Sequence, residues 1–238
     1  MSESFFSVVD QLADIFWAGR IGFKAIAGLG IAQTYILMLM TARMGLDAGM
    51  RSMVARAIGA RDIRYANHVV IQSITITFVW SFVVGGSGMI YADPLLRLIG
   101  IDEEVVALTS GYLKMQFLAM SLLSFQRLFG GALQAAGDSI TPLKAITVSR
   151  VIHLSLTPFL IFGWWTFPSM GLAGAGVANV IAQIFAIALN LHALMSGRTD
   201  IKLKLSDYRI DMNLIWRILK VGIPAGITGM KRLSLIHI

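Results

Sequence analysis

The stretch Val69–Tyr91, VVIQSITITFVWSFVVGGSGMIY, decides the fold class because it contains no Asp, Glu, Lys or Arg. It is long enough to cross about 30 Å of hydrocarbon as a single helix. The whole chain shares this character, since 56% of its 238 residues are hydrophobic and only 14% are charged. An average soluble domain has roughly a quarter of its residues charged. The sequence therefore predicts an all-α membrane protein and excludes a soluble fold.

Further apolar stretches predict a bundle of six transmembrane helices. The run Val151–Gly197 also lacks Asp, Glu, Lys and Arg, but it is too long for one crossing and is interrupted by the sequence GWWTFPS at Gly163–Ser169. It is expected to form two spans joined by a tight turn. We expect residues 1–197 to form a six-helix lobe and residues 198–213 to form a cytoplasmic linker. The other expected spans are Ser4–Ala18, Ala25–Ala42 and Met115–Ala136, and Leu214–Met230 is expected to begin a seventh.

The distribution of Lys and Arg predicts the orientation. These residues accumulate in the cytoplasmic connections of membrane proteins. Here they concentrate in every second connection, which predicts a multi-pass membrane protein with a cytoplasmic N-terminus. The cytoplasmic connections then explain the net charge of +7. The sequence does not indicate nucleic-acid binding, since no basic cluster alternates with aromatic residues suited to base stacking. The basic residues are Arg51, Arg56, Arg61 and Arg64, then Lys144 and Arg150, then Arg198, Lys202, Lys204, Arg209, Arg217 and Lys220.

Both ends of the sequence suggest a fragment. The first span has about fifteen residues before Gly19, fewer than the roughly 20 that a crossing needs, so the first helix is expected to be truncated. No positively charged segment precedes it, which argues against a cleaved signal peptide. Lys231 and Arg232 interrupt the seventh span. Residues 231–238 continue no pattern and are expected to be a non-native tail.

Acidic residues in the first span are the leading candidates for ion coupling. Ser7, Asp10, Gln11 and Asp14 recur at three- and four-residue spacing and are expected to share one helical face. An ionisable side chain inside the membrane is costly and usually functional. Two carboxylates one turn apart cannot both carry charge cheaply in an apolar medium, so at least one is expected to bind a proton or a cation. The alternative is an amphipathic interfacial helix whose acids lie in water.

The fifth and sixth spans carry candidate cavity residues. Arg150, His153 and Thr157 share one face of the fifth span and could line a substrate cavity. Alternatively, Arg150 extends to the cytoplasmic interface and His153 bonds a carbonyl group. Asn179 and Gln183 are four residues apart in the sixth span, and such amides serve as ligands or as hydrogen-bonding links between helices.

Other features of the sequence indicate structure rather than catalysis. Arg43 and Asp47 are one turn apart and are expected to pair, while Gly45 and Gly49 offer a face for close helix packing. There is no P-loop or complete dinucleotide-binding loop, and the four histidines have no zinc spacing. With zero cysteines, no thiolate metal site is possible. We therefore expect no enzyme, no cofactor and no firm metal site.

Several short segments of the chain are characteristic when they are taken together. They are Asp14–Gly22 (DIFWAGRIG), Gly45–Leu46 with Gly49 and Ala57–Asp62 (AIGARD), Leu133–Asp138 (LQAAGD) with Thr141–Pro142, Leu160–Gly163 (LIFG), Gly171–Gly176 (GLAGAG) and Gly222–Gly226 (GIPAG). In this order they resemble the multidrug and toxic compound extrusion (MATE) family of secondary transporters. No single segment is decisive, but their order along the chain matches the family from about Val8 to Met230.

The resemblance implies one lobe of a twelve-helix antiporter, with the C-terminal lobe missing, that exports drugs or other hydrophobic, often cationic, small molecules in exchange for H⁺ or Na⁺. The family's coupling acid in helix one falls on Asp14, and the preceding amide falls on Gln11. In helix five, Arg150, His153 and Thr157 replace the common pattern of asparagines and an aspartate, which favours proton coupling.

Two alternatives to the antiporter differ in their expected polar residues. A flippase for lipid-linked oligosaccharides, from the same superfamily, would line its cavity with several cationic residues, whereas here Arg127 and Arg150 are the only candidates. A noncatalytic membrane interaction subunit would not need a pair of acids inside a span.

Overall fold

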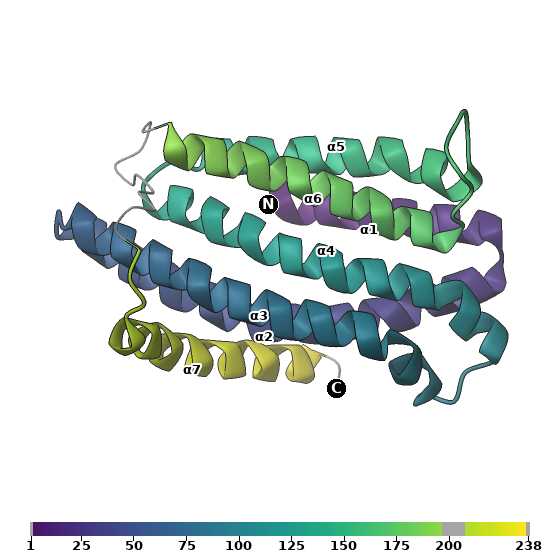
Figure 1. Cartoon of the computed structure of the whole chain (residues 1–238), viewed down its shortest axis with the longest axis horizontal. Coiled ribbons are helices and arrows are strands. Elements are labelled where there is room, and N and C mark those ends of the chain that lie inside the picture. Colours follow the sequence, from purple (N-terminus) through teal and green to yellow (C-terminus); the bar gives the residue numbers. More distant parts are fainter. Residues whose placement is uncertain (1, 197–207, 237–238) are drawn as a thin grey trace. The chain divides into compact units, whose positions relative to one another are not determined.

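The computed structural model describes residues 2–196 and 208–236, and it places side chains at residues 8–41, 43–196 and 208–228. These described parts contain seven α-helices and no strand (Figure 1). The helices are α1 (Ser2–Ile21), α2 (Phe23–Gly59), α3 (Ile63–Arg97), α4 (Glu103–Ala135), α5 (Ile140–Phe162), α6 (Leu172–Met195) and α7 (Met212–Ile236).

Five of the described helices, α2 to α6, are long and apolar enough to cross a membrane. They contain the second to sixth spans that the sequence predicts, so the all-α membrane class is confirmed. Helix α1 has 20 residues but is not among these five, and a crossing by the first helix stays a prediction. The orientation, and the assignment of residues 198–213 to the cytoplasm and of residues 231–238 to a non-native tail, also stay predictions.

The predicted helix ends are wrong in several places. Arg51 and Arg56 lie inside α2 rather than in a connection, and α5 begins at Ile140 rather than at Val151. Helix α7 begins at Met212, inside the expected linker, and continues to Ile236, so Lys231 does not end it. The reason is that hydropathy marks only the part of a helix that would lie in hydrocarbon, whereas backbone hydrogen bonds continue into polar sequence.

Aspartates cap the starts of three helices. The carboxylate Oδ1 of Asp62 accepts a hydrogen bond from the amide of Tyr65 at 2.9 Å, and that of Asp138 accepts one from the amide of Thr141 at 3.0 Å. Asp211 accepts one from the amide of Leu214 at 3.1 Å. Such side chains satisfy amides that have no partner within the first helical turn.

The chain forms two compact units, and several helices contribute to both. Unit 1 comprises residues 1–36, 81–123 and 143–186. Within it, α5 and α6 lie side by side (Figure 1) because Gly174 has no side chain, and a Cβ atom there would lie 2.6 Å from the carbonyl oxygen of Leu160. The turn between these helices carries Trp164, which stacks on Phe162 with ring centroids 5.9 Å apart. The aromatic connection that the sequence predicts is present, but it is longer than a tight turn because α5 ends at Phe162 and α6 begins at Leu172.

Unit 2 comprises residues 37–80, 124–142 and 187–238. Its core is a cluster of buried apolar side chains from α2, α3, α4, α6 and α7. The largest of these include Met50, Leu128, Leu133, Leu194 and Ile218.

The start of α7 is attached to α3 by polar contacts. The Gln72 amide donates to the carbonyl of Arg209 at 2.6 Å and accepts from the amide of Asp211 at 3.1 Å. The backbone amide of Leu214 and the side chain of His68 hold the pKa of Asp211 below its usual value. The stabilisation from this carboxylate is therefore present near neutral pH and is lost as the pH falls through its lowered pKa.

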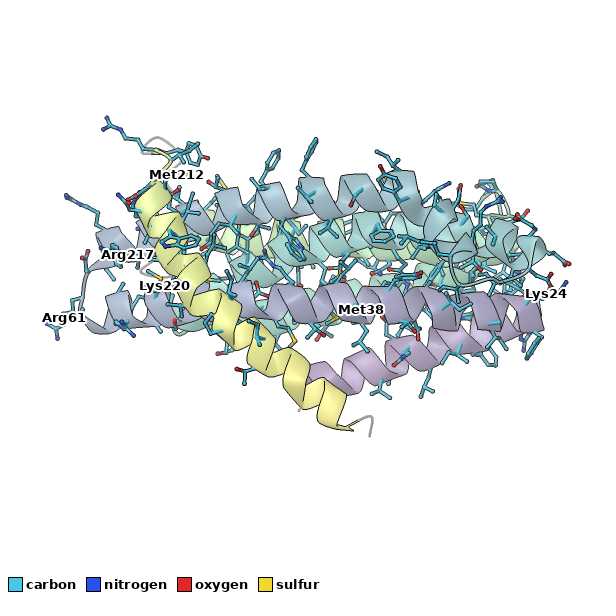
Figure 2. The ribbon with its side chains drawn as sticks, turned by 90° about the horizontal axis from the view of Figure 1, so that it is seen from below. Lys24, Met38, Arg61, Met212, Arg217 and Lys220 are labelled. Carbon is cyan, nitrogen blue, oxygen red and sulfur yellow. The ribbon has the colours of Figure 1, made fainter. Side chains whose placement is uncertain are left out.

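Helix α7 crosses α2 obliquely (Figure 2), at the glycines that the sequence predicts as a close-packing face. A Cβ atom at Gly45 would lie 2.7 Å from the backbone nitrogen of Gly226, and one at Gly49 would lie 2.7 Å from the carbonyl oxygen of Ile218. The two backbones are therefore in direct contact, and no side chain fits between them.

Gly45→Ala is expected to destabilise unit 2 because the added methyl group would overlap the α7 backbone. Overpacking of this kind typically costs about 1–3 kcal/mol. The matched control is Gly30→Ala on the same helix, where a Cβ atom would meet nothing within 4 Å. Thermal unfolding of the purified chain in detergent should show a lower midpoint for Gly45→Ala and an unchanged or higher one for Gly30→Ala. Equal midpoints for the two variants would show that the crossing is not tightly packed.

Candidate functional site

The two acids of α1 are buried in unit 1. Asp10 and Asp14 are each only 8% exposed, whereas Leu12 is 61% exposed. Helical spacing explains this, because positions four residues apart lie on one face and Leu12 lies on the other. Gln11 departs from the predicted face, since it is exposed and its amide nitrogen donates to Gln33 Oε1 at 3.0 Å. The side chain of Ser7, the fourth residue of the predicted face, lies outside the described residues.

Helix α5 supplies the partners of Asp10. The Arg150 guanidinium forms an ion pair with Asp10 Oδ2, so Arg150 bonds inside unit 1 instead of extending away from it. Nδ1 of His153 lies 2.6 Å from Asp10 Oδ1. A carboxylate has about four lone-pair sites, and Asp10 uses both of its oxygens on these two basic side chains.

His153 connects the two acids. Its Nε2 lies 3.3 Å from the carbonyl oxygen of Ala175 and 3.8 Å from Asp14 Oδ1, and the side chain is almost fully buried. Every one of these partners is an acceptor, so both ring nitrogens can donate only if the ring is doubly protonated. Arg150 is also positive. When both acids are ionised, the cluster therefore has two positive and two negative side chains, and its net charge is zero.

Thr157 does not face the acids with its hydroxyl group. The hydroxyl donates to the carbonyl oxygen of His153 in the preceding turn at 2.7 Å. Of the three cavity candidates in α5, the structure thus brings Arg150 and His153 to the acids and leaves Thr157 bonded within its own helix.

The amides of α6 link this helix to α4. Asn179 Nδ2 donates to Gln116 Oε1 at 3.0 Å, and Gln183 Nε2 lies 3.4 Å from Asn179 Oδ1. Gln116 in turn donates to the hydroxyl oxygen of Tyr112 at 2.7 Å. These contacts support the interpretation of Asn179 as a link between helices, whereas the contact of Gln183 lies within α6.

Sequence reasoning missed two members of this amide chain. Tyr112 and Gln116 lie one turn apart in α4 and are buried, and Tyr112 is close enough to Asp14 to interact with it electrostatically. Their four-residue spacing in an apolar helix was the available signal. The sequence could not single out the carbonyl oxygen of Ala175 as the acceptor for His153, because every residue has a backbone carbonyl group.

The geometry gives the two acids different chemical capacities. Asp10 is bound by two basic groups, whereas Asp14 contacts His153 at 3.8 Å, beyond the usual hydrogen-bond distance. Asp14 is therefore the acid better able to exchange a proton or a small cation. In the part of the chain that the structure describes, no group of three or more His, Cys, Asp or Glu side chains could hold a metal ion.

Comparison with known proteins shows the family. The sequence model of the MatE family matches residues 1–159, about two thirds of the chain. The chain belongs to the MatE family. The resemblance seen in the sequence is thereby confirmed, and since this is a family of membrane transporters, the expectation that the chain is not an enzyme is confirmed as well.

Curated relatives of the chain include transporters with different names. The chain is 29% identical over 223 residues to the probable multidrug resistance protein YoeA of Bacillus subtilis, with 92% of this chain and 48% of YoeA covered. It is 27% identical over 185 residues to a protein of Shewanella oneidensis named FAD transporter, with 78% of this chain and 41% of that protein covered. The chain thus spans about half the length of the curated relatives it matches.

Solved structures of the family share the fold. A multidrug resistance MATE family transporter in an inward-facing conformation matches with a TM-score of 0.84 and 24% identity, over 92% of this chain and 49% of that one. A MATE structure in a bent conformation matches with a TM-score of 0.87 and 22% identity, over 97% of this chain and 51% of that one. The architecture of the described helices is therefore that of about half of such a transporter.

Asp10→Ala is expected to destabilise the chain more than Asp14→Ala. Removing Asp10 leaves Arg150 and His153 without their acidic partner, and breaking a buried ion pair in this way costs about 3–5 kcal/mol. Asp14 makes only the longer contact to His153, so its removal should cost less. Thermal unfolding of both variants in detergent checks this. An Asp14→Ala variant at least as unstable as Asp10→Ala would contradict the assignment of Asp10 as the anchored acid.

Proposed function

We propose that this chain is one lobe of a secondary active antiporter in the bacterial inner membrane that exports hydrophobic, often cationic, compounds in exchange for protons. Membership of the MatE family supports the transport activity. The observation that carries the proposal is one cluster in unit 1, in which Asp10, Asp14 and His153 are buried and Arg150 is partly buried. Ionisable groups placed inside a membrane protein are costly, and they commonly mark proton or ion pathways.

In this proposal Asp14 exchanges the coupling ion and Asp10 holds the cluster together. Asp10 is engaged by Arg150 and His153, so it has little capacity left for an incoming ion. Gln11, which the resemblance associates with Asp14, is exposed and bonded to Gln33 and therefore takes no direct part in this exchange.

The composition of the cluster favours H⁺ over Na⁺ as the coupling ion. A sodium ion needs several oxygen ligands, but around Asp10 the places next to the carboxylate are occupied by nitrogen donors of Arg150 and His153. A proton needs only one carboxylate oxygen, which Asp14 can provide. No cofactor is required for such coupling.

The same cluster favours cationic over anionic cargo. A substrate with phosphate groups, as in the FAD transporter among the relatives, would need basic side chains free to bind it. Arg150 and His153 are instead committed to Asp10. For the same reason, a flippase of lipid-linked oligosaccharides is the less suitable function. A noncatalytic interaction subunit would gain nothing from a buried pair of acids.

Transport in this proposal needs a second lobe. Alternating access in transporters built from two repeats arises when one repeat moves against the other around a central site. The small-molecule substrate would bind between this lobe and its counterpart, with lipid around both.

The two-lobe protein that contains this lobe is expected to accumulate a fluorescent hydrophobic cation in everted membrane vesicles with an acidic lumen, because protons leaving the lumen drive the cation in. Collapsing the pH gradient should abolish accumulation, and a sodium gradient alone should not restore it. Fluorescence quenching measures the uptake. Unchanged uptake after both gradients are collapsed would refute coupling, and uptake driven by sodium alone would refute the choice of proton. Uptake of FAD in preference to the cation would refute the cargo class.

Asp14→Asn is expected to abolish coupled uptake in the same vesicles while leaving insertion unchanged, because the amide keeps the shape of the side chain but cannot take up a proton. Asp10→Asn should retain more activity. Asp102→Asn, at an exposed acid of the α3–α4 connection, is the matched control and should transport like the parent. Full activity of Asp14→Asn together with loss of activity in Asp10→Asn would assign the coupling role to the other carboxylate.

A further inference from the structure

Helix α2 carries a second pair of ionisable side chains, Arg43 and Asp47, which belongs to unit 2 and takes no part in the acid cluster. Both side chains are buried, with exposed fractions of 3% and 6%. Arg43 Nη2 lies 3.1 Å from Asp47 Oδ1. The pairing that the sequence predicts is thereby confirmed.

The protein satisfies only part of the hydrogen-bonding capacity of this pair. Arg43 Nη2 donates to Thr77 Oγ1 at 2.9 Å and lies 3.4 Å from the carbonyl oxygen of Ser124. Nε and Nη1 of Arg43 and Oδ2 of Asp47 are buried and make no hydrogen bond, and Asp47 Oδ1 has only its ion pair with Arg43 Nη2. They are four of the seven buried side-chain atoms without a hydrogen-bond partner in the described part of the chain. Buried polar atoms are rarely left unpaired, so this concentration points to a missing partner.

A small cavity lies against the same atoms. Its volume is about 10 Å³, and its polar lining consists of Arg43, Asp47, Ser73 and Thr77. One water molecule needs roughly 10–15 Å³ of such volume and two to four polar partners. Both conditions are close to being met here. Ile218 of α7 forms part of the apolar wall and is itself almost fully buried.

The lining is better suited to water than to an ion. Arg43 lies in the cavity wall, and Arg51 and Arg127 also act electrostatically on Asp47, so three positive groups oppose the entry of a cation. The carboxylate of Asp47 opposes an anion in the same space. A water molecule can donate both of its hydrogens to carboxylate oxygens and accept hydrogen bonds from guanidinium nitrogens.

We propose that one ordered water molecule is bound between Arg43 and Asp47 and bridges the two side chains. It completes the hydrogen bonds of Nε or Nη1 on one side and of the carboxylate on the other. With Thr77 it joins α2 to α3 through a polar network inside unit 2. Helix α7 packs closely on the glycines of α2 where the two helices cross (Figure 2), and this contact holds Ile218 in the wall of the cavity. The closure of the water site therefore depends on the position of α7.

A crystal or cryo-electron microscopy structure of the full chain, at a resolution that shows ordered waters, tests the proposal. A density peak is expected within hydrogen-bond distance of the Asp47 carboxylate and of Arg43 Nε or Nη1. Crystals soaked in bromide or rubidium salts should give no anomalous signal there. An empty cavity would overturn the proposal. An anomalous signal in the cavity would also overturn it, because it would show that an ion and not a water molecule occupies the site.

Two variants sharpen this test. The double variant Arg43→Met/Asp47→Leu removes both polar partners with side chains of similar length, so the peak should disappear. Arg56→Met, at an exposed position of the same helix, is the control and should keep the peak. A peak that persists in the double variant would overturn the bridging role. If the double variant does not fold, the density in the parent chain still decides.

Discussion

The bond between Asp10 of α1 and the basic pair of α5, Arg150 and His153, is the interaction on which the site in unit 1 depends. A charge placed in an apolar medium must be matched by an opposite charge or by hydrogen bonds, and a charge that loses its partner is strongly destabilising. Since α1 and α5 are far apart in the sequence, this contact joins two helices that local sequence patterns do not connect, together with the edge contact of Trp17 with Phe162. It also places His153 between Asp10 and Asp14, and so separates the anchored acid from the exchangeable one.

The same constraint operates in unit 2 in a different form. Arg43 and Asp47 lie on one helix, so their pairing requires no neighbour, but the neighbours α3 and α7 determine whether the pair is dry or hydrated. The close approach of α7 is possible because Gly45 and Gly49 leave the surface of α2 without side chains. In membrane proteins, packing through small residues replaces much of the hydrophobic driving force that water supplies to soluble folds. Backbone contact and polar pairing therefore act together in this unit.

Sequence patterns predicted what depends on local spacing. The apolar runs predicted the helices α2 to α6. The four-residue spacing predicted the Arg43–Asp47 pair and the placement of Asp10 and Asp14 on one buried face. The ends of the helices were wrong because hydropathy marks the hydrocarbon-crossing part of a helix and not the extent of its hydrogen bonds.

Contacts between distant parts of the sequence lay beyond such patterns. The contact of Arg150 with Asp10 joins residues 140 positions apart, and periodicity contains no information on which helices are neighbours. The bond of His153 to the carbonyl of Ala175 could not be found, because a backbone acceptor has no sequence signature. Gln11 departed from the predicted face because, near the edge of a buried stripe, a small rotation of the helix exposes a side chain.

In the proposed mechanism Asp14, and not Asp10, is the acid that exchanges the proton. Infrared difference spectroscopy of the purified chain, recorded between acidic and alkaline buffer, measures this through the carbonyl stretch of a protonated carboxyl group. A protonation-dependent band is expected in the parent chain; it should persist in Asp10→Asn and disappear in Asp14→Asn. A band that disappears in Asp10→Asn and persists in Asp14→Asn would contradict it.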